Sequence, residues 1–231
     1  MENELPPSAG AAAVLWPMPP RTKRGPKPRF SIDGITEAAL VIADRDGLAA
    51  VTMQSVAEAL GTTKMALYRH VPGRTELDAL LLDRAIGTCP PLRGEDWRSA
   101  LDDWASHLHA RARQHPWTVE LAQRPHLPGP HELGWFEAGL AATTALPLSG
   151  GERLDALVLL TGHVFSLMRQ ESMPHPEATL AAGIADILTV RSEDFPHTAA
   201  AFADTSTRDD ALRFGLDRIL DGIGALVSRR S

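Results

Sequence analysis

Apolar residues recur every three or four positions along most of the chain, the spacing that places them on one face of an α-helix. The first such stripe consists of Ile32, Ile35, Ala39 and Ile42. Ser31 precedes it and is suited to cap a helix, and the Asp46–Gly47 turn follows it. No segment alternates apolar and polar residues as a half-buried strand would. The pattern therefore predicts an all-α protein.

Two short helical segments follow at about 53–60 and 64–70, each preceded by a threonine that can cap it. Gly61 lies in the turn between them, where glycine tolerates the left-handed backbone that ends a helix. Two short helices joined by such a turn make a helix-turn-helix. A further helix is expected from Thr75 to Gly87, and two prolines at 90–91 then mark a domain boundary.

Beyond residue 90 the helical spacing continues to the C-terminus. It predicts helices at 97–115, 117–123, 132–145, 152–169, 177–190 and 207–227. The segment 152–169 is apolar on most of its circumference, and the apolar residues of 207–227 are spaced almost as in a coiled coil. We therefore expect these two helices to pack against a second copy of the chain. The residues expected at this dimer interface are Gly162, Leu212, Gly215, Leu216, Ile219, Gly222 and Ile223.

The 231 residues carry a net charge of −6, but the charge is unevenly distributed. Residues 1–20 contribute −2, residues 21–74 contribute +4 and residues 75–231 contribute −8. A short basic segment attached to a larger acidic one indicates that only the basic part binds a polyanion. Residues 1–20 lack the basic start of a secretion signal, and no apolar run is long enough to span a bilayer. The sequence therefore predicts a cytoplasmic protein without a membrane partner.

The N-terminal residues 1–20 are rich in alanine and proline and show no helical period. We therefore expect them to be disordered, and Trp16 has no assigned role. The next ten residues, RTKRGPKPRF, are basic, and their prolines favour an extended chain because proline disfavours helix in the residue before it. The first helix is thus expected only from Ser31 onward.

The sequence lacks the motifs of common enzymes and cofactor sites. It has no Gly-x-Ser-x-Gly, and the segment 149–151 lacks the lysine of a phosphate-binding Walker loop. The segment 131–135 begins like a zinc-protease motif but ends in Trp135 where a histidine is needed. No two of the nine histidines stand four residues apart, and Cys89 is the only cysteine. We therefore expect no enzyme activity, no cofactor and no site-specific metal.

The run from Val51 to Leu77, VTMQSVAEALGTTKMALYRHVPGRTEL, resembles the DNA-binding signature of the tetracycline-repressor (TetR) family. In that family the helix-turn-helix ends in Leu-Tyr-Arg/Trp-His-Val/Phe. Residues 213–223, RFGLDRILDGI, and 113–117, RQHPW, are similar to the subgroup that shares the tetracycline repressor's own C-terminal domain. The resemblance implies a homodimer with a DNA-reading head of three helices, a fourth connecting helix and a helical ligand-binding body. In such proteins the ligand changes the separation of the two heads and releases the palindromic operator.

With this resemblance the chain divides into three parts. They are a disordered tail with a basic arm (1–30), a helix-turn-helix DNA-binding domain (31–87), and a helical ligand-binding and dimerisation domain (88–231). The charge distribution supports this division, because the basic segment 21–74 falls in the arm and the DNA-binding domain and the acidic segment contains the body.

The second helix of a helix-turn-helix lies in the major groove, where its first turns meet base edges. The residues expected to read the sequence are Thr62, Thr63, Lys64 and Met65. The resemblance implies phosphate contacts for Tyr68, His70, Arg74, Thr75 and Thr52, with Gln54 reaching a base or a phosphate. Lys27 and Arg29 of the basic arm would enter the minor groove. The alternatives are that the threonines only cap helices, Lys64 is solvated, Tyr68 belongs to the core and the arm is a solubilising linker.

Four of the five tryptophans lie between residues 97 and 135, and this aromatic surface predicts a cavity in the body. The expected lining is Trp104, His107, Leu108, Trp135, Phe136, His163 and Leu167. The two imidazoles would supply the polar groups, and the acidic body favours a neutral or cationic aromatic ligand. An arginine such as Arg111, Arg113 or Arg169 would reverse that preference if it pointed inward. The alternative is that these aromatic residues are simply core.

Taken together, these features predict a sequence-specific, dimeric transcriptional repressor that a small apolar or aromatic ligand releases from double-stranded DNA. Two alternatives stay open. One is a regulator of the same fold that acts as an activator or has no ligand. The other is a helical enzyme or small-molecule carrier whose basic head is incidental.

Overall fold

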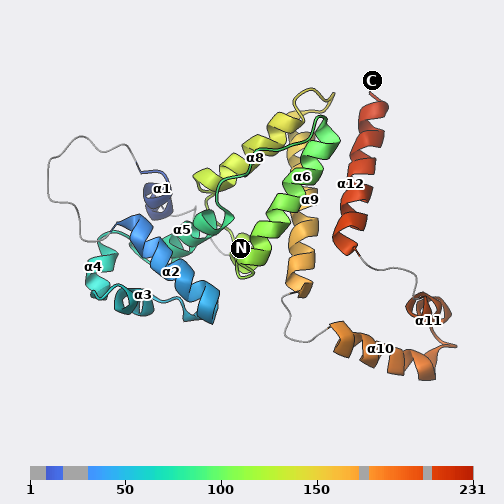
Figure 1. The fold of residues 1–231 in the computed structure, drawn as a ribbon, viewed down its shortest axis with the longest axis horizontal. Coiled ribbons are helices and arrows are strands. Elements are labelled where there is room, and N and C mark those ends of the chain that lie inside the picture. Colours follow the sequence, from blue (N-terminus) through green and yellow to red (C-terminus); the bar gives the residue numbers. More distant parts are fainter. Residues whose placement is uncertain (1–8, 18–30, 172–176, 205–209, 231) are drawn as a thin grey trace, which may run out of the picture.

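The computed structural model describes residues 9–17, 31–171, 177–204 and 210–230. Within these ranges every regular element is a helix, so the all-α prediction is confirmed. Figure 1 shows a small group of helices linked to a larger bundle. The basic arm, with Lys27 and Arg29, lies outside the described residues.

The small group, called the head below, contains α2 (Ile32–Asp46), the short 3₁₀ helix η1 (Leu48–Ala50), α3 (Met53–Ala59), α4 (Lys64–Tyr68) and α5 (Arg74–Ile86). The Ser31 hydroxyl caps α2 by accepting a hydrogen bond of 3.1 Å from the N–H of Gly34. Gly61 has a φ of +60° in the turn between α3 and α4, which explains the glycine there. Ile35, Val56 and Leu67 are fully buried and join α2, α3 and α4 in one core. The head is thus the predicted helix-turn-helix.

The helix α5 connects the head to the rest of the chain, and its C-terminal carbonyl groups are held by the other part. The Arg111 guanidinium donates to the carbonyl oxygens of Ile86 (2.9 Å) and Ala85 (2.8 Å). The indole N–H of Trp135 donates to the carbonyl of Gly87 at 2.8 Å. Carbonyl groups at a helix C-terminus lack partners within the helix, so these bonds fix the end of α5.

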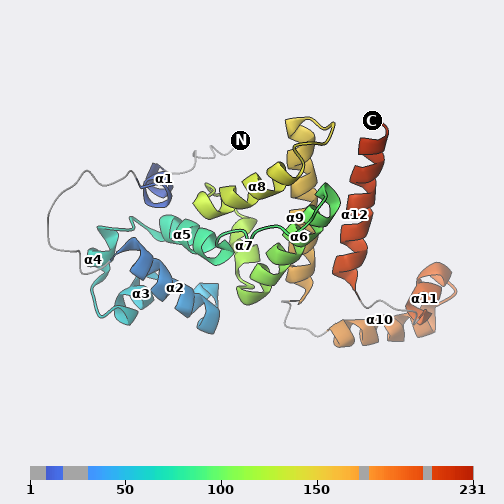
Figure 2. The same ribbon diagram turned by 45° about the horizontal axis from the view of Figure 1, so that its top comes forward.

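The larger part, called the body below, contains α6 (Trp97–Gln114), α7 (Thr118–Ala122), α8 (Pro130–Ala142), α9 (Gly150–Glu171), α10 (Glu177–Arg191), α11 (Pro196–Ala203) and α12 (Ala211–Ser228). The helices α6, α8, α9 and α12 pack side by side (Figures 1 and 2). Leu101 of α6 and Leu157 and Leu160 of α9 are fully buried between them. None of the described helices is both long and apolar enough to cross a membrane.

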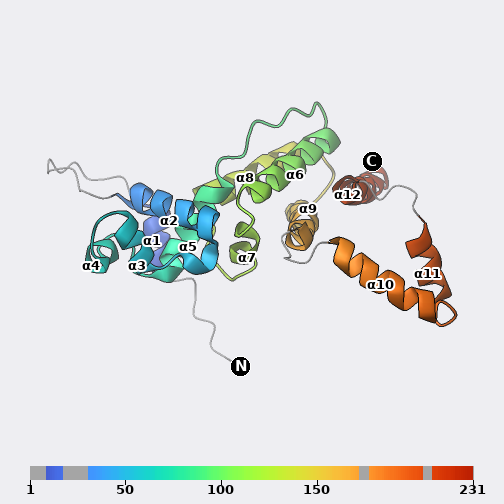
Figure 3. The ribbon, with the colours of Figure 1, turned by 60° about the horizontal axis from the view of Figure 1, so that its bottom comes forward.

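The helices α10 and α11 contact each other and extend away from the bundle, as Figure 3 shows. The sequence pattern predicted only the first of them. Ile187, Val190 and Phe195 are exposed in this extension. The extension therefore leaves apolar side chains uncovered in the single chain.

The expectation that residues 1–20 are disordered is wrong for the segment 9–16. Residues Ala9–Leu15 form the helix α1, which packs on α5. Ala11, Val14 and Leu15 are buried there, and the indole N–H of Trp16 donates to the carbonyl of Pro128 at 3.2 Å. A seven-residue helix is not stable alone in water, so its order comes from this tertiary packing.

Part of the predicted dimer stripe on α12 packs on the protein's own body. Leu216 and Ile223 are buried in the single chain, and Leu212 and Ile219 are half-buried against the same core. A Cβ atom at Gly215 would lie 2.1 Å from Cε1 of His163, so Gly215 allows α12 to approach α9. By contrast, Gly162 and Gly222 are exposed and have open space around them.

Candidate functional site

The helix α4 presents an exposed face that has no packing role inside the protein. Leu67 and the following Val71 are fully buried and anchor this helix to the head. Thr63 caps it, and Lys64, Met65 and Tyr68 point outward. Met65 is 71% exposed. Lys64, Met65 and Tyr68, which were predicted to contact DNA, thus lie together on the exposed face of α4.

The other candidates on α3 and around α4 lie on or near the same surface. The Thr52 hydroxyl accepts from the N–H of Ser55 at 3.0 Å and so caps α3, while the exposed Gln54 amide donates to Glu58. Thr62 is half-buried, and its N–H closes the turn by donating to the carbonyl of Ala57 at 2.9 Å. His70 is half-buried and Thr75 is exposed in the first turn of α5. Thr52, Gln54 and Thr75 are exposed, whereas Thr62 and His70 are half-buried.

Arg74 differs from the prediction that its side chain contacts phosphate. Its guanidinium donates to Asp78 at 2.5 Å, to the carbonyl of Leu48 at 3.3 Å and to the carbonyl of Val51. Three acceptors inside the protein therefore bind the Arg74 guanidinium, which was predicted from the sequence to contact a phosphate. Arg74 ties the start of α5 to the segment that leads into α3.

Three carboxylates of the head receive donors from the body. Asp44 of α2 accepts from the indole N–H of Trp117 at 2.8 Å, and Asp78 of α5 lies 3.4 Å from the Arg124 guanidinium. The buried Asp83 accepts from the backbone N–H groups of residues 131 and 132 at 2.9 and 3.1 Å, and so caps α8.

Sequence reasoning did not identify these carboxylates, although two signals were present. Asp83 directly follows three leucines in α5, and Asp44 lies near the C-terminal end of its helix, where the dipole disfavours a negative charge. An acidic residue at such a position indicates a partner outside its own helix. Because both partners come from the body, these residues form the joint between the two parts.

The predicted ligand-site residues are only partly brought together. The Trp104 and Trp135 rings meet edge to face with centroids 5.8 Å apart, and the Trp104 indole donates to the carbonyl of Trp135 at 2.9 Å. Leu108 is buried as well, and Phe136 and Leu167 are half-buried. These contacts agree with the alternative that the tryptophans are core residues. They also connect the cluster directly to the end of α5 through the bond from Trp135 to Gly87.

The two histidines of the predicted site lie in different surroundings. A ring nitrogen of His163, Nε2, lies 3.1 Å from the carbonyl oxygen of Leu212, so this side chain faces α12. Nε2 of His107 lies 3.3 Å from Asp103, one turn earlier on α6. The geometry therefore gives no joint role to the two imidazoles.

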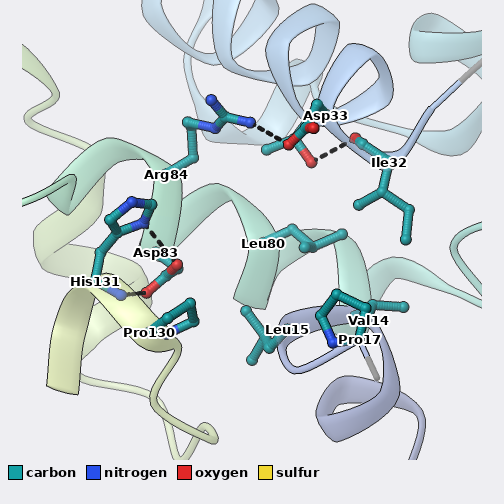
Figure 4. A pocket seen from close by; sticks show the side chains of 11 residues that line it. Val14, Leu15, Pro17, Ile32, Asp33, Leu80, Asp83, Arg84, Pro130 and His131 are labelled. Carbon is teal, nitrogen blue, oxygen red and sulfur yellow. Dashed lines mark hydrogen bonds and ion pairs between the residues drawn. The ribbon is translucent and has the colours of Figure 1, made fainter. Parts of the chain in front are cut away.

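Two cavities of the described residues lie elsewhere. One, of about 350 Å³, lies at the ends of α6 and α9 and is lined by Arg113, Pro116, Met168 and Glu171. The other, of about 220 Å³, lies where the head meets the body, and Figure 4 shows its lining. Neither cavity is lined by the seven residues expected to line the ligand site, although Arg113, one of the arginines named there, lines the first cavity.

The described residues contain neither a metal site nor a reactive cysteine. No group of three or more His, Cys, Asp or Glu side chains is placed there to hold a metal ion. Burial, with a smaller effect from the charge of Asp103, raises the pKa of the Cys89 thiol to about 11. At neutral pH this thiol is therefore protonated and a poor nucleophile.

Comparisons with known proteins agree with the two parts of the fold. Residues 35–78 match the family described as bacterial regulatory proteins, tetR family, and residues 90–227 match the tetracyclin repressor-like C-terminal domain. The chain is 35% identical over 232 residues to the HTH-type transcriptional repressor DrrR1 of Streptomyces coeruleorubidus, covering 94% of this chain and 86% of that protein. It is 30% identical over 199 residues to an HTH-type transcriptional regulator of Saccharopolyspora erythraea, covering 84% of each.

Solved structures show the same fold at lower identity. The structure of apo ActR from Streptomyces coelicolor superposes with a TM-score of 0.78 at 23% identity, covering 89% of this chain and 100% of that chain. ActR in complex with actinorhodin gives a TM-score of 0.73 at 24% identity, covering 87% of this chain and 99% of that one. Since both domain families match in chain order and a repressor relative covers nearly the whole length, the protein belongs to the TetR family of DNA-binding transcriptional regulators.

Proposed function

We propose that the protein is a homodimeric repressor that acts in the cytoplasm and binds a palindromic operator. A small apolar or aromatic ligand bound in the body would release it, and the protein itself would catalyse no reaction. The observation that carries the proposal is the outward face of α4, where Lys64, Met65 and Tyr68 are exposed on a helix anchored by Leu67. The relative DrrR1 is a transcriptional repressor, and this similarity supports repression over activation.

On this proposal each exposed group of the head has its own contact with DNA. Lys64 donates to a guanine edge, and the Met65 side chain and the Thr63 methyl meet thymine methyl groups. Tyr68, Thr52 and Thr75 donate hydroxyl protons to phosphates, and His70 and Gln54 lie close enough to assist. Arg74 acts indirectly through the carbonyls that it holds. The minor-groove role of Lys27 and Arg29 stays part of the proposal.

We place the dimer interface on the outer faces of α9 and α12. On α9, Val158 and Leu159 are 59% and 58% exposed, and Leu154 is exposed one turn earlier. On α12, Phe214 is exposed, and Gly222 offers open space for close approach. Large exposed apolar side chains on two neighbouring helices favour association of two copies. Two linked heads could then bind half-sites about 34 Å apart.

We place the ligand among α6, α8 and α9, where the aromatic cluster lies. ActR, which has the same fold, has been solved in complex with actinorhodin, and this supports a small-molecule ligand for this protein. A ligand that displaced Trp104 or Trp135 would also displace the end of α5, because Trp135 holds Gly87. To release DNA, the ligand must bind the released arrangement more tightly than the DNA-bound one.

The test of DNA binding starts by selecting duplexes from a random-sequence library with the wild-type protein. We expect a palindrome. Lys64→Ala should weaken binding to it by about 1–3 kcal/mol and relax the preference at one base pair, whereas Tyr68→Ala should weaken all sequences alike. Arg191→Ala, which removes a positive charge on α10 far from the head, is the control. Failure to select any sequence, or unchanged binding by both head variants, would refute the proposal.

The ligand is tested by a tryptophan-fluorescence titration of small aromatic compounds with and without the selected duplex. A compound that quenches fluorescence and lowers duplex affinity is an inducer. Trp104→Leu should then weaken its binding, because this ring lies in the cluster. If an inducer binds this variant as tightly as the wild type, the cluster is core and the ligand binds elsewhere in the body.

A further inference from the structure

The helix α1 packs against α5, next to which it lies in Figures 1 and 2. At its start, a Cβ atom on Gly10 would lie 2.5 Å from Oε1 of Glu76, so α1 begins close to the first turn of α5 in the head. At its end, Trp16 donates to the carbonyl of Pro128 in the loop before α8, in the body. One short segment thus contacts both parts of the protein.

The cavity at the joint is lined by α1, the head and the body together (Figure 4). Its volume is about 220 Å³. The end of α1 and the residues after it contribute Val14, Leu15 and Pro17. The head contributes residues such as Ile32 and Leu80, and the body contributes Pro130 and His131. In the same place Asp83 of α5 holds the first turn of α8, and Arg84 pairs with Asp33 of α2 at 2.5 Å. The buried side chains of α1 therefore close the joint on one side.

We propose that Leu15 and Trp16 are positioning residues, through which α1 holds the head at a fixed orientation to the body. The proposal rests on the proposed binding of a palindromic operator by a dimer. Both half-sites are engaged at once only if the two heads keep a defined separation. A head whose orientation is less restricted loses more freedom on binding, and this loss weakens the complex. A head held by α1 is already ordered, so α1 strengthens operator binding without touching DNA.

A positioning role differs in one measurable way from a role in folding of the head. A duplex with a single half-site needs one intact head and no particular separation. Damage to α1 should therefore weaken binding to the full palindrome and leave binding to the half-site duplex unchanged. It should also weaken discrimination against palindromes whose half-sites are moved apart by one base pair.

The experiment compares Leu15→Asp and Trp16→Phe with the matched control Ala13→Asp. Leu15 is buried and Ala13 is exposed on the same helix, so the two aspartates add the same charge on opposite faces. Trp16→Phe keeps an aromatic ring and removes only the N–H donor. Affinities are measured by fluorescence anisotropy at one salt concentration, for the selected palindrome and for its half-site. Circular dichroism and sedimentation report folding and dimer formation.

We expect Leu15→Asp to weaken palindrome binding about tenfold, within the range of measured coupling effects, and Trp16→Phe to weaken it severalfold. Both should bind the half-site like the wild type, and Ala13→Asp should match the wild type on both duplexes. Equal losses on palindrome and half-site, unchanged palindrome binding, or tighter binding would each overturn the proposal. If Leu15→Asp does not fold, Trp16→Phe decides. If the wild type binds no palindrome at all, the proposed function has failed, and this outcome is distinct from a failure of α1.

Discussion

The indole nitrogen of Trp117 lies 2.8 Å from Oδ1 of Asp44 and donates a hydrogen bond to it. Asp44 lies in the last turn of α2, where the helix dipole disfavours a negative charge. His115 adds a second group from the body, with Nδ1 2.8 Å from the same oxygen. The carboxylate therefore joins the head to the body and does not stabilise its own helix.

We expect Trp117→Phe to lower the free energy of unfolding by about 1–2 kcal/mol, because one hydrogen bond to a charged acceptor is lost while most of the ring packing is kept. Urea denaturation at pH 7 measures this. Asp44→Asn and Asp46→Asn form a matched pair, since the same change is made two residues apart. Asp46 pairs with its exposed neighbour Arg45, so Asp46→Asn should change stability by no more than about 0.5 kcal/mol. Equal effects of the two asparagines would contradict the role of Asp44.

The Arg74 guanidinium gives a second prediction, because its three acceptors lie inside the head. Arg74→Met leaves the carbonyls of Leu48 and Val51 without this donor and should cost about 1–3 kcal/mol in the free energy of unfolding. Arg74→Lys should recover little of the loss, since an ammonium cannot reproduce the planar fork. Arg45→Met, at a largely exposed arginine, is the control and should be close to neutral.

The same Arg74 variants distinguish a positioning role from direct phosphate contact. A positioning role predicts that Arg74→Lys weakens DNA binding although its positive charge is kept. A phosphate contact predicts that lysine substitutes well. Duplex affinity at two salt concentrations separates the two, and a rescued affinity with an unchanged salt dependence would restore the contact that sequence reasoning assigned.

The helix-turn-helix could be predicted from the sequence because its signals are local. Ser31, Thr52 and Thr63 cap the helices that follow them, and Gly61 adopts the left-handed backbone of the turn. The role of Arg74 could not be predicted in this way, because its acceptors at Leu48 and Val51 lie more than twenty residues earlier in the chain. A contact between residues so far apart in the chain depends on how α2, α3 and α5 pack.

The helix α1 was missed for a related reason. Its seven residues, AGAAAVL, carry no polar face, and a helix this short is unstable in isolation. The order comes from the apolar surface of α5, which the sequence of α1 does not reveal. Trp16 was the only signal, since a tryptophan in a segment expected to be disordered indicates a partner.

The loop that accepts the Trp16 hydrogen bond contains a titratable contact. Nε2 of His126 lies 3.0 Å from Glu132 in the first turn of α8, and Nδ1 lies 2.7 Å from the carbonyl of Arg124. The hydrogen bond to Glu132, opposed by burial and assisted by the Arg124 carbonyl, raises the pKa of His126 above its ordinary value of 6.5. Stability from this contact is therefore complete below about pH 6.5 and is lost as the pH rises through the raised pKa.

We expect His126→Asn to reduce stability more at pH 6 than at pH 8, measured by urea denaturation across this range. Glu132→Gln removes the main cause of the raised pKa, so it should abolish the same pH dependence. The double variant should lose no more pH dependence than either single variant. A difference between wild type and His126→Asn that stays constant with pH would contradict this prediction.

The alkylation rate of Cys89 measures how well the segment that follows α5 is buried. Its pKa of about 11 leaves about one thiol in a thousand ionised at pH 8, against about one in ten at the ordinary value of 9.0. Alkylation by iodoacetamide at pH 8 should therefore be about a hundredfold slower in the native protein than in urea. Asp103→Asn removes the smaller of the two causes and should speed the native reaction only slightly. Equal native and unfolded rates would show that Cys89 is solvated.

The apolar stripe of α12 shows a limit of sequence periodicity. From the spacing of Leu212, Leu216, Ile219 and Ile223 we predicted one covered face and expected a second copy of the chain to cover it. In the structure α6 and α9 of the same chain cover Leu216 and Ile223. The side chains available for contact with a second copy can be identified only from the packing, because the packing shows which face of each helix stays exposed.

Substitutions can distinguish the exposed face of α9 from the face of α12 that packs on the body. Val158→Asp places a charge on the exposed face of α9 and should yield a folded monomer, seen by sedimentation at micromolar concentration, that binds a half-site duplex but not the palindrome. Val41→Asp, the same change at an exposed position of α2 in the head, should remain a dimer. Ile219→Asp, at a half-buried position packed on the body, should instead lower the thermal midpoint, because it puts a charge into the protein's own core. Since a fold defect and a lost interface are thereby distinguished, a Val158→Asp protein that stays dimeric would exclude the outer face of α9 as the contact between subunits.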